Sequence, residues 1–212
     1  GYNTIDGNYV ANASGYSFHG YKHVPNLDSS GDRYVNNTSV NPGTGHIIVD
    51  GQPGAGGMPL DRYVIIANNV FRGGSAATLG LMLAAPAIVS GNVVEDVPNG
   101  QAISVNGGGD GSTIANNMLV NSGALILKVP ATAVGNTLRG GQGIHVTGAG
   151  ARVEANRVMA VGANGVGIDA SRVVVTNNDV GVSGSAACLK VYSGAGLIAR
   201  GNILTATNGA QW

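Results

Sequence analysis

The sequence predicts a single all-β domain in which short strands coil around one axis and pair with the strands of the next lap. Three observations support this: a motif with a central Asn recurs along the chain, each copy is followed by a second strand-like segment, and residues that favour solvated helices are scarce. Gly accounts for 36 of the 212 residues and charged residues for only 10%, against a usual value of about a quarter. We therefore expect no significant helix.

The recurring motif is an apolar residue, two small or polar residues, Asn, any residue, and a second apolar residue. Its copies are centred on Asn8, Asn37, Asn69, Asn92, Asn117, Asn136, Asn156, Asn178 and Asn202. From Asn92 onward the copies lie 19 to 25 residues apart, a spacing typical of solenoid laps. Ser39 stands where the other copies have their second apolar residue. Because Asn tolerates left-handed turns and stacked amides can hydrogen-bond along a ladder, we expect these side chains in one stacked line.

A second strand follows each motif, as in "YSFHG", "HIIVD", "GIHVT" and "CLKVY". With rungs about 4.8 Å apart, about nine laps would form a rod on the order of 40 Å long. A leucine-rich repeat is excluded because Leu is sparse and no segment has a helical period. A left-handed coil of hexapeptides is excluded because it requires laps of constant length, and these laps vary.

The domain organisation is simple. We interpret residues 1–212 as one domain, an excerpt of a longer chain, with long loops at 20–33 and 50–63. Loops of this length on a tight scaffold often carry binding function. The longest apolar run, "LGLMLAAPAIV", is too short to span a bilayer. Cys188 is expected to be a buried, unreactive thiol.

The recurring Asn motif and its paired strands resemble the right-handed parallel β-helix proteins of the pectate-lyase-like superfamily, over roughly residues 3–205. This group includes polysaccharide lyases, alginate epimerases and phage tailspikes. The resemblance implies a carbohydrate-directed module that recognises, and in a lyase-like member cleaves, an extracellular or surface polysaccharide. The alternative is a non-catalytic shaft or decoration protein of a virion. The Asp-Pro-His-Glu motif of the epimerases and the Arg-x-Pro-x-x-Arg segment of pectate lyases do not occur.

One outward column on the second strands concentrates ionisable groups. Our alignment of these strands places in it His19, Ile48, Met82, Ser104, Lys128, His145, Asp169 and Lys190. Neighbours about 4.8 Å apart would let Asp169 accept a hydrogen bond from His145 and raise its basicity. We therefore predict His145, Asp169 and Lys190 as catalytic candidates for β-elimination. Glycoside hydrolysis fits less well because it needs two carboxylates. A purely solvated face with paired charges is the alternative interpretation.

The predicted substrate-binding residues are Lys128 and Ser104 in the column together with Lys22, His23, Arg33 and Arg62 in or beside the long loops. We expect no cofactor or metal. The segment "NGGGDGS" at 106–112 is similar to a calcium-binding repeat but occurs once, whereas such sites need stacked copies. A net charge of zero argues against a nucleic-acid partner. We expect a polysaccharide partner, no membrane association, a homo-oligomer with a trimer as the favoured form, and an extracellular or virion-associated location.

Overall fold

A computed structural model of the protein describes residues 3–20, 31–49, 63–98 and 100–208. Within these residues the chain forms 26 β-strands and no helix. The strands make three parallel sheets, two with nine strands and one with eight. The predicted all-β parallel solenoid is confirmed.

Among the described residues, sheets A and B each take one strand from nine laps, and sheet C takes one strand from each of the first eight. Sheet A contains β1 (Thr4–Asp6), β4 (Arg33–Val35), β7 (Val64–Ala67), β10 (Ala87–Ser90), β13 (Thr113–Ala115), β16 (Thr132–Val134), β19 (Arg152–Glu154), β22 (Val174–Thr176) and β25 (Ile198–Arg200). Sheet B contains β2 (Tyr9–Ala11), β5 (Thr38–Val40), β8 (Val70–Arg72), β11 (Val93–Glu95), β14 (Met118–Val120), β17 (Thr137–Arg139), β20 (Arg157–Val161), β23 (Asp179–Ser183) and β26 (Ile203–Thr207). Sheet C contains β3 (Tyr16–Gly20), β6 (Gly45–Val49), β9 (Leu79–Leu83), β12 (Gln101–Val105), β15 (Ala124–Leu127), β18 (Ile144–Val146), β21 (Val166–Asp169) and β24 (Leu189–Ser193).

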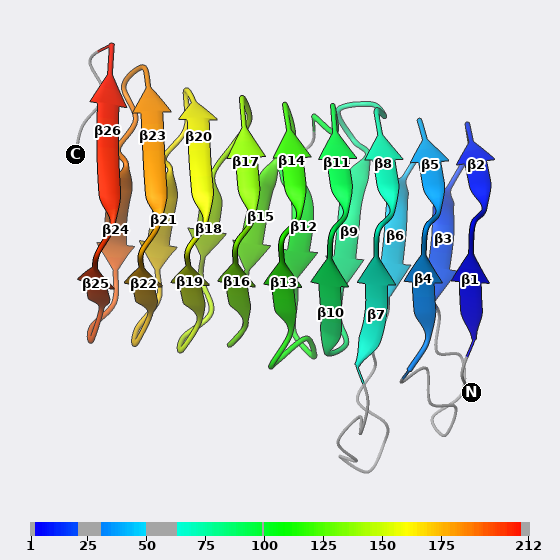
Figure 1. Ribbon diagram of the computed structural model, residues 1–212, viewed down its shortest axis with the longest axis horizontal. Coiled ribbons are helices and arrows are strands. Elements are labelled where there is room, and N and C mark those ends of the chain that lie inside the picture. The colour runs from blue at the N-terminus through cyan, green and yellow to red at the C-terminus, as the bar shows by residue number, and fades with distance from the viewer. Residues whose placement is uncertain (1–2, 21–30, 50–62, 99, 209–212) are drawn as a thin grey trace.

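The coil is right-handed, as Figure 1 shows. The strands of sheets A and B run upward in front, the strands of sheet C run downward behind, and successive laps advance from the N-terminal end at the right to the C-terminal end at the left. Sheets A and B meet at the ladder Asn, and sheet C returns the chain to the start of the next lap.

The core lies inside the coil and is built from stacked Val, Ile and Leu side chains. In sheet B, Val94, Leu119 and Leu138 occupy equivalent positions on three successive strands, and each is at most 2% exposed. In sheet C, Leu125 and Ile144 occupy equivalent positions on neighbouring strands and are also buried. Alternate residues therefore point inward and outward, as a strand with a period of two requires.

The nine predicted Asn side chains form one continuous ladder. Each Asn Nδ2 from Asn8 to Asn178 donates to the Oδ1 of the ladder Asn one lap later, at 2.9–3.1 Å. Each backbone N–H donates to the same oxygen at 2.8–3.0 Å. The seven ladder residues from Asn37 to Asn178 are buried, so the hydrogen bonds satisfy polar groups that would otherwise be costly inside the protein.

The reason that we gave for Asn at these corners is only half right. The left-handed backbone conformation falls on the residue before the ladder Asn, for example Asn116 (φ 55°), Gly135 (φ 66°) and Ala155 (φ 52°). The ladder Asn itself has a negative φ at every one of these corners, since none is among the residues with positive φ. Hydrogen bonding along the stack, and not turn geometry, is therefore what the ladder Asn provides.

Ser39, the exception in the motif, has a buried partner. It faces the core between Val10 and Phe71, and its Oγ lies 2.7 Å from Nδ1 of His46. Nε2 of His46 lies 3.1 Å from the carbonyl oxygen of Gly73, and the buried ring packs near Phe71. Burial lowers the pKa of His46 from 6.5 to about 4, although the hydrogen bond to Gly73 opposes the shift. The ring is therefore neutral and donates from Nε2 to Gly73, while Nδ1 faces the Ser39 hydroxyl, which is also hydrogen-bonded to Oγ of Ser17 at 2.7 Å.

His46 should make the stability of the protein fall in mild acid. Its pKa is about 4 in the folded state and 6.5 as its ordinary value, so the unfolded state binds the proton more tightly. Stability therefore decreases as the pH falls from about 6.5 to about 4 and levels off below that, with a total loss of about 3 kcal/mol. Urea unfolding of the natural chain and of His46→Gln across this range measures the difference.

Carboxylates titrate in both chains, so their contribution cancels in the difference between the two stability curves. His145→Gln is the matched control because it makes the same substitution at a half-buried position on the outer face and leaves His46 in place, so the loss of stability in acid that we assign to His46 should remain in this variant. Parallel curves for the natural chain and His46→Gln would contradict the assignment of a neutral buried imidazole.

Candidate binding site on sheet C

The outward column of sheet C differs from the predicted one at two laps. Strand pairing aligns His19, Ile48, Met82, Ser104, Ile126, His145, Gly167 and Lys190. Lys128 follows the end of β15 and Asp169 is the last residue of β21, each two residues beyond the column position. Their placement in the column was wrong. The run of four ionisable groups on successive laps does not exist.

The predicted hydrogen bond between His145 and Asp169 is also not formed. Asp169 accepts a hydrogen bond from Oγ of Ser193, and the ring of His145 has no hydrogen bond to any described residue. The ring of His145 instead lies edge-on to Tyr192, with the ring centroids 6.3 Å apart. Asp169 therefore does not contact His145 in the way that the sequence predicted.

A β-bulge in the last strand of sheet C positions Tyr192. The pairing of β21 with β24 shifts between Ile168 and Asp169, so Val191 pairs with Ile168 and Ser193 with Asp169, leaving Tyr192 as the extra residue. Bulges redirect side chains in this way. A Cβ at Gly167 would lie in ordinary van der Waals contact with both rings, 3.4 Å from Tyr192 and 3.5 Å from His145. The ring of Tyr192 therefore extends back over Gly167 to reach His145.

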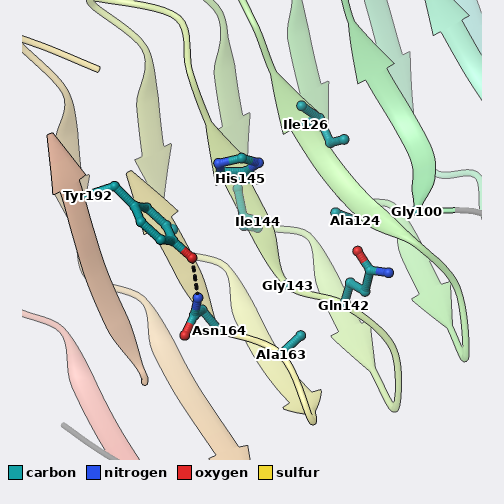
Figure 2. Close-up of a pocket in the computed structure, with 11 residues that line it drawn as sticks. Gly100, Ala124, Ile126, Gln142, Gly143, Ile144, His145, Ala163, Asn164 and Tyr192 are labelled. Atoms are coloured by element: carbon teal, nitrogen blue, oxygen red, sulfur yellow. Dashed lines mark hydrogen bonds between the residues drawn. The ribbon is translucent and has the colours of Figure 1, made fainter. Parts of the chain in front are cut away.

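An open hollow of about 180 Å³ lies beside these rings on the outer face of sheet C. Figure 2 shows Tyr192 with its hydroxyl at Asn164 and His145 next to its ring. Nδ2 of Asn164 donates to the Tyr192 hydroxyl at 2.7 Å, which fixes the direction of the ring. The hollow is lined by Gly100, Ala124, Ile126, Gln142, Gly143, Ile144, His145, Ala163, Asn164, Gly167 and Tyr192.

The chemistry of the hollow combines an aromatic face with uncharged hydrogen-bonding groups. Gln142 is exposed and its side-chain amide forms no hydrogen bond to a described residue, so this amide is available to a ligand. No carboxylate lines the hollow. Nζ of Lys190 lies 4.9 Å from the centroid of the Tyr192 ring and adds a positive charge beside the hollow. The site therefore favours a polar or anionic ligand over a cation.

The other predicted binding residues do not converge on this hollow. Ser104 is fully buried and donates to Oδ1 of Asn106 at 3.1 Å, so it cannot contact a ligand. Arg33 begins β4 and belongs to sheet A. Lys128 is exposed after β15. Lys22, His23 and Arg62 lie outside the described residues.

Sequence reasoning missed Tyr192, Gln142 and Asn164. Tyr192 closes the strand "CLKVY" two residues after Lys190, and a lone aromatic next to a lysine was the available signal. Gln142 and Asn164 precede their strands in turns, where nothing in the strand pattern marks them.

Among the described residues, no three His, Cys, Asp or Glu side chains lie together as metal ligands would. The same part of the chain contains no helix of the length and apolarity needed to cross a membrane.

Comparison with known proteins gives no match to a family model, to a curated protein or to a solved structure. The chain is thus a parallel β-solenoid, and its kinship with the pectate-lyase-like superfamily stays a prediction.

Proposed function

We propose that the protein is a carbohydrate-binding β-solenoid that holds an extracellular or surface polysaccharide on the outer face of sheet C, with Tyr192 as the central contact. The observation that carries this proposal is the fixed orientation of the Tyr192 ring, held by Asn164 and His145. An aromatic side chain that is already ordered presents a large apolar face at low entropic cost. The apolar face of a sugar ring can stack on it while the sugar hydroxyls reach Gln142 and Asn164.

The dimensions of the site fit one sugar unit of a longer polymer. Its volume of about 180 Å³ is below the range of about 300–1,000 Å³ found for drug-sized ligands. Rungs about 4.8 Å apart are close to the length of one pyranose unit, so an extended chain along the coil would place successive units on successive laps. The proposal locates the protein outside the cell or on a virion, where such polymers occur.

Binding without cleavage is the form of the proposal that the geometry supports best. The predicted β-elimination relied on Asp169 to activate His145, and these residues form no hydrogen bond. Lys190 supplies one positive charge near the ring, which suits recognition of a uronate carboxylate. Cleavage by His145 can be tested directly, because β-elimination would produce an unsaturated uronate, which absorbs ultraviolet light.

Tyr192→Ala should weaken polysaccharide binding about tenfold, because the stacking contact is lost, and should leave the melting temperature unchanged because the ring is 53% exposed. Affinity electrophoresis against neutral and acidic polysaccharides would measure this. Tyr63→Ala is the matched control, since Tyr63 is exposed just before β7.

Lys190→Gln should weaken the binding of acidic polymers only, and it should make that binding depend less on salt concentration.

Two results would refute the proposal. In one, no polysaccharide in a broad panel binds, which would leave a structural role such as a spike shaft. In the other, Tyr192→Ala and Tyr63→Ala have equal effects, which would place the binding surface elsewhere.

A further inference from the structure

The hollow on sheet C exists because two neighbouring outward columns contain small residues. The pairing of β15 with β18 places Ala124 beside Gly143, each just before an inward residue of its strand. Gly167 follows His145 in the next outward column. These small residues leave the surface of the sheet low, and the larger side chain of Ile126 rises at one side of the hollow, as Figure 2 shows.

The floor and two sides of the hollow are apolar. Ala124 and Ala163 contribute methyl groups, and Ile126 contributes a larger aliphatic side chain. Among the described residues that line the hollow there is no Lys, Arg, Asp or Glu. A charged ligand group would lose its hydration here without gaining an opposite charge. The hollow therefore favours an uncharged ligand group that carries a methyl.

Two polar groups without partners border this apolar floor. Gly143 is buried, yet its backbone N–H has no acceptor among the described residues. Such an N–H is rare in folded proteins and costs free energy until a ligand or water accepts from it. The preceding residue, Gln142, is exposed, and its side-chain amide can both donate and accept. A donor and an acceptor thus lie on adjacent residues.

The second amide of the hollow, that of Asn164, is already held in place. Its Nδ2 donates to the Tyr192 hydroxyl at 2.7 Å, and its Oδ1 accepts from the backbone N–H of Ala187 at 3.0 Å. Asn164 therefore forms a fixed wall beside the ring. The side chain of Gln142, in contrast, is free to turn toward a ligand.

We propose that the polysaccharide on sheet C contains an N-acetylated amino sugar linked to a uronic acid, and that the acetamido group occupies the hollow. This inference rests on the carbohydrate-binding function proposed above. The acetamido methyl packs on Ala124 and Ile126. Its carbonyl oxygen accepts from the N–H of Gly143, and its own N–H donates to Oε1 of Gln142. The ring of the amino sugar stacks on Tyr192.

Other substituents match the hollow less well. A hydroxyl has no methyl for the apolar floor, and a carboxylate has neither a methyl nor a donor. The carboxylate of the neighbouring uronic acid belongs instead near Lys190, whose Nζ lies 4.9 Å from the centroid of the Tyr192 ring and which does not line the hollow. A polymer that contains both kinds of sugar satisfies both features of the surface.

Two polymers and two small competitors test the proposal. Heparosan alternates N-acetylglucosamine with glucuronic acid, whereas polygalacturonate has uronates and no acetamido group. Heparosan should migrate with the protein in affinity electrophoresis, and the methyl glycoside of N-acetylglucosamine should displace it. The methyl glycoside of glucose, which has a hydroxyl in place of the acetamido group and the same charge, should require roughly tenfold more for the same displacement, since it lacks these contacts.

Variants of the hollow should reduce the preference for heparosan. Gln142→Ala removes the amide, and Ala163→Leu fills the hollow from its side. Each should lower the ratio of heparosan affinity to polygalacturonate affinity roughly tenfold, and each should keep the melting temperature of the natural chain. Thr147→Ala is the matched control, because Thr147 is exposed just after β18 and does not line the hollow. This variant should keep the ratio unchanged.

The outcomes separate this inference from the proposed function. If both polymers bind and Tyr192→Ala weakens both, but the two methyl glycosides compete equally, the acetamido assignment is overturned and carbohydrate binding on sheet C stands. An unchanged ratio in Gln142→Ala and Ala163→Leu would overturn the assignment in the same way. If neither these polymers nor any other polysaccharide binds, the proposed function fails and the acetamido assignment fails with it.

Discussion

Leu119→Asp is expected to leave the protein largely unfolded. Leu119 is 2% exposed and stacks between Val94 and Leu138 inside the coil. Loss of a buried Leu side chain costs about 2–5 kcal/mol, and an unpaired buried carboxylate adds several more. Together these approach the entire stability of a typical domain, about 5–15 kcal/mol. Circular dichroism of the purified variant and its solubility on expression would measure the effect.

Met118→Asp is the matched control, because Met118 precedes Leu119 on the same strand and is 40% exposed. This variant should fold with nearly unchanged stability. Val94→Asp, one lap earlier on the inward side, should repeat the result of Leu119→Asp. If Leu119→Asp and Met118→Asp melted at similar temperatures, the inward and outward faces of sheet B would be wrongly assigned.

The contrast between Leu119 and Met118 also shows why the fold was predictable from the sequence. A strand's alternation has a period of two, so the apolar residue two places after each Asn identifies the inward face without any knowledge of neighbouring strands. The spacing of the Asn residues then gives the lap length. Ser39 breaks the pattern, and the structure explains it through His46, a partner seven residues away that no periodic rule identifies.

The candidate site was less predictable because its geometry depends on register. Alternation tells which face a residue occupies, but a shift of two residues leaves the face unchanged. Ile126 and Lys128 are therefore equivalent by pattern, as are Gly167 and Asp169, and only the pairing of the strands separates them. Tyr192 reaches His145 because of a bulge, which adds one residue to a strand and is not visible in its composition.

Asn136→Ala is expected to destabilise the protein by about 4 kcal/mol without changing its fold. The substitution removes two hydrogen bonds that Asn136 Oδ1 accepts, at 2.9 and 3.0 Å from Nδ2 and the backbone N–H of Asn117. It also removes the two that Nδ2 donates, at 2.9 Å to Oδ1 of Asn156 and 2.8 Å to the carbonyl oxygen of Ile114. The groups left without partners are buried, and each costs about 1–3 kcal/mol. Equilibrium unfolding in urea would measure the loss.

Two further variants separate the role of the ladder from the loss of side-chain volume. Asn8→Ala removes an exposed ladder residue and should cost under about 1 kcal/mol, because water can replace its hydrogen bonds. Asn136→Asp keeps the acceptor for Asn117 but directs its second carboxylate oxygen at Oδ1 of Asn156 and the carbonyl oxygen of Ile114. Because like acceptors repel, its folded-state pKa should be raised above the ordinary value for Asp. Its stability relative to Asn136→Ala should therefore increase as the pH falls, when protonation restores one donor. A gap between these two variants that did not change with pH would show that the polarity of the ladder, donors toward the C-terminal laps, does not control the stability of the coil.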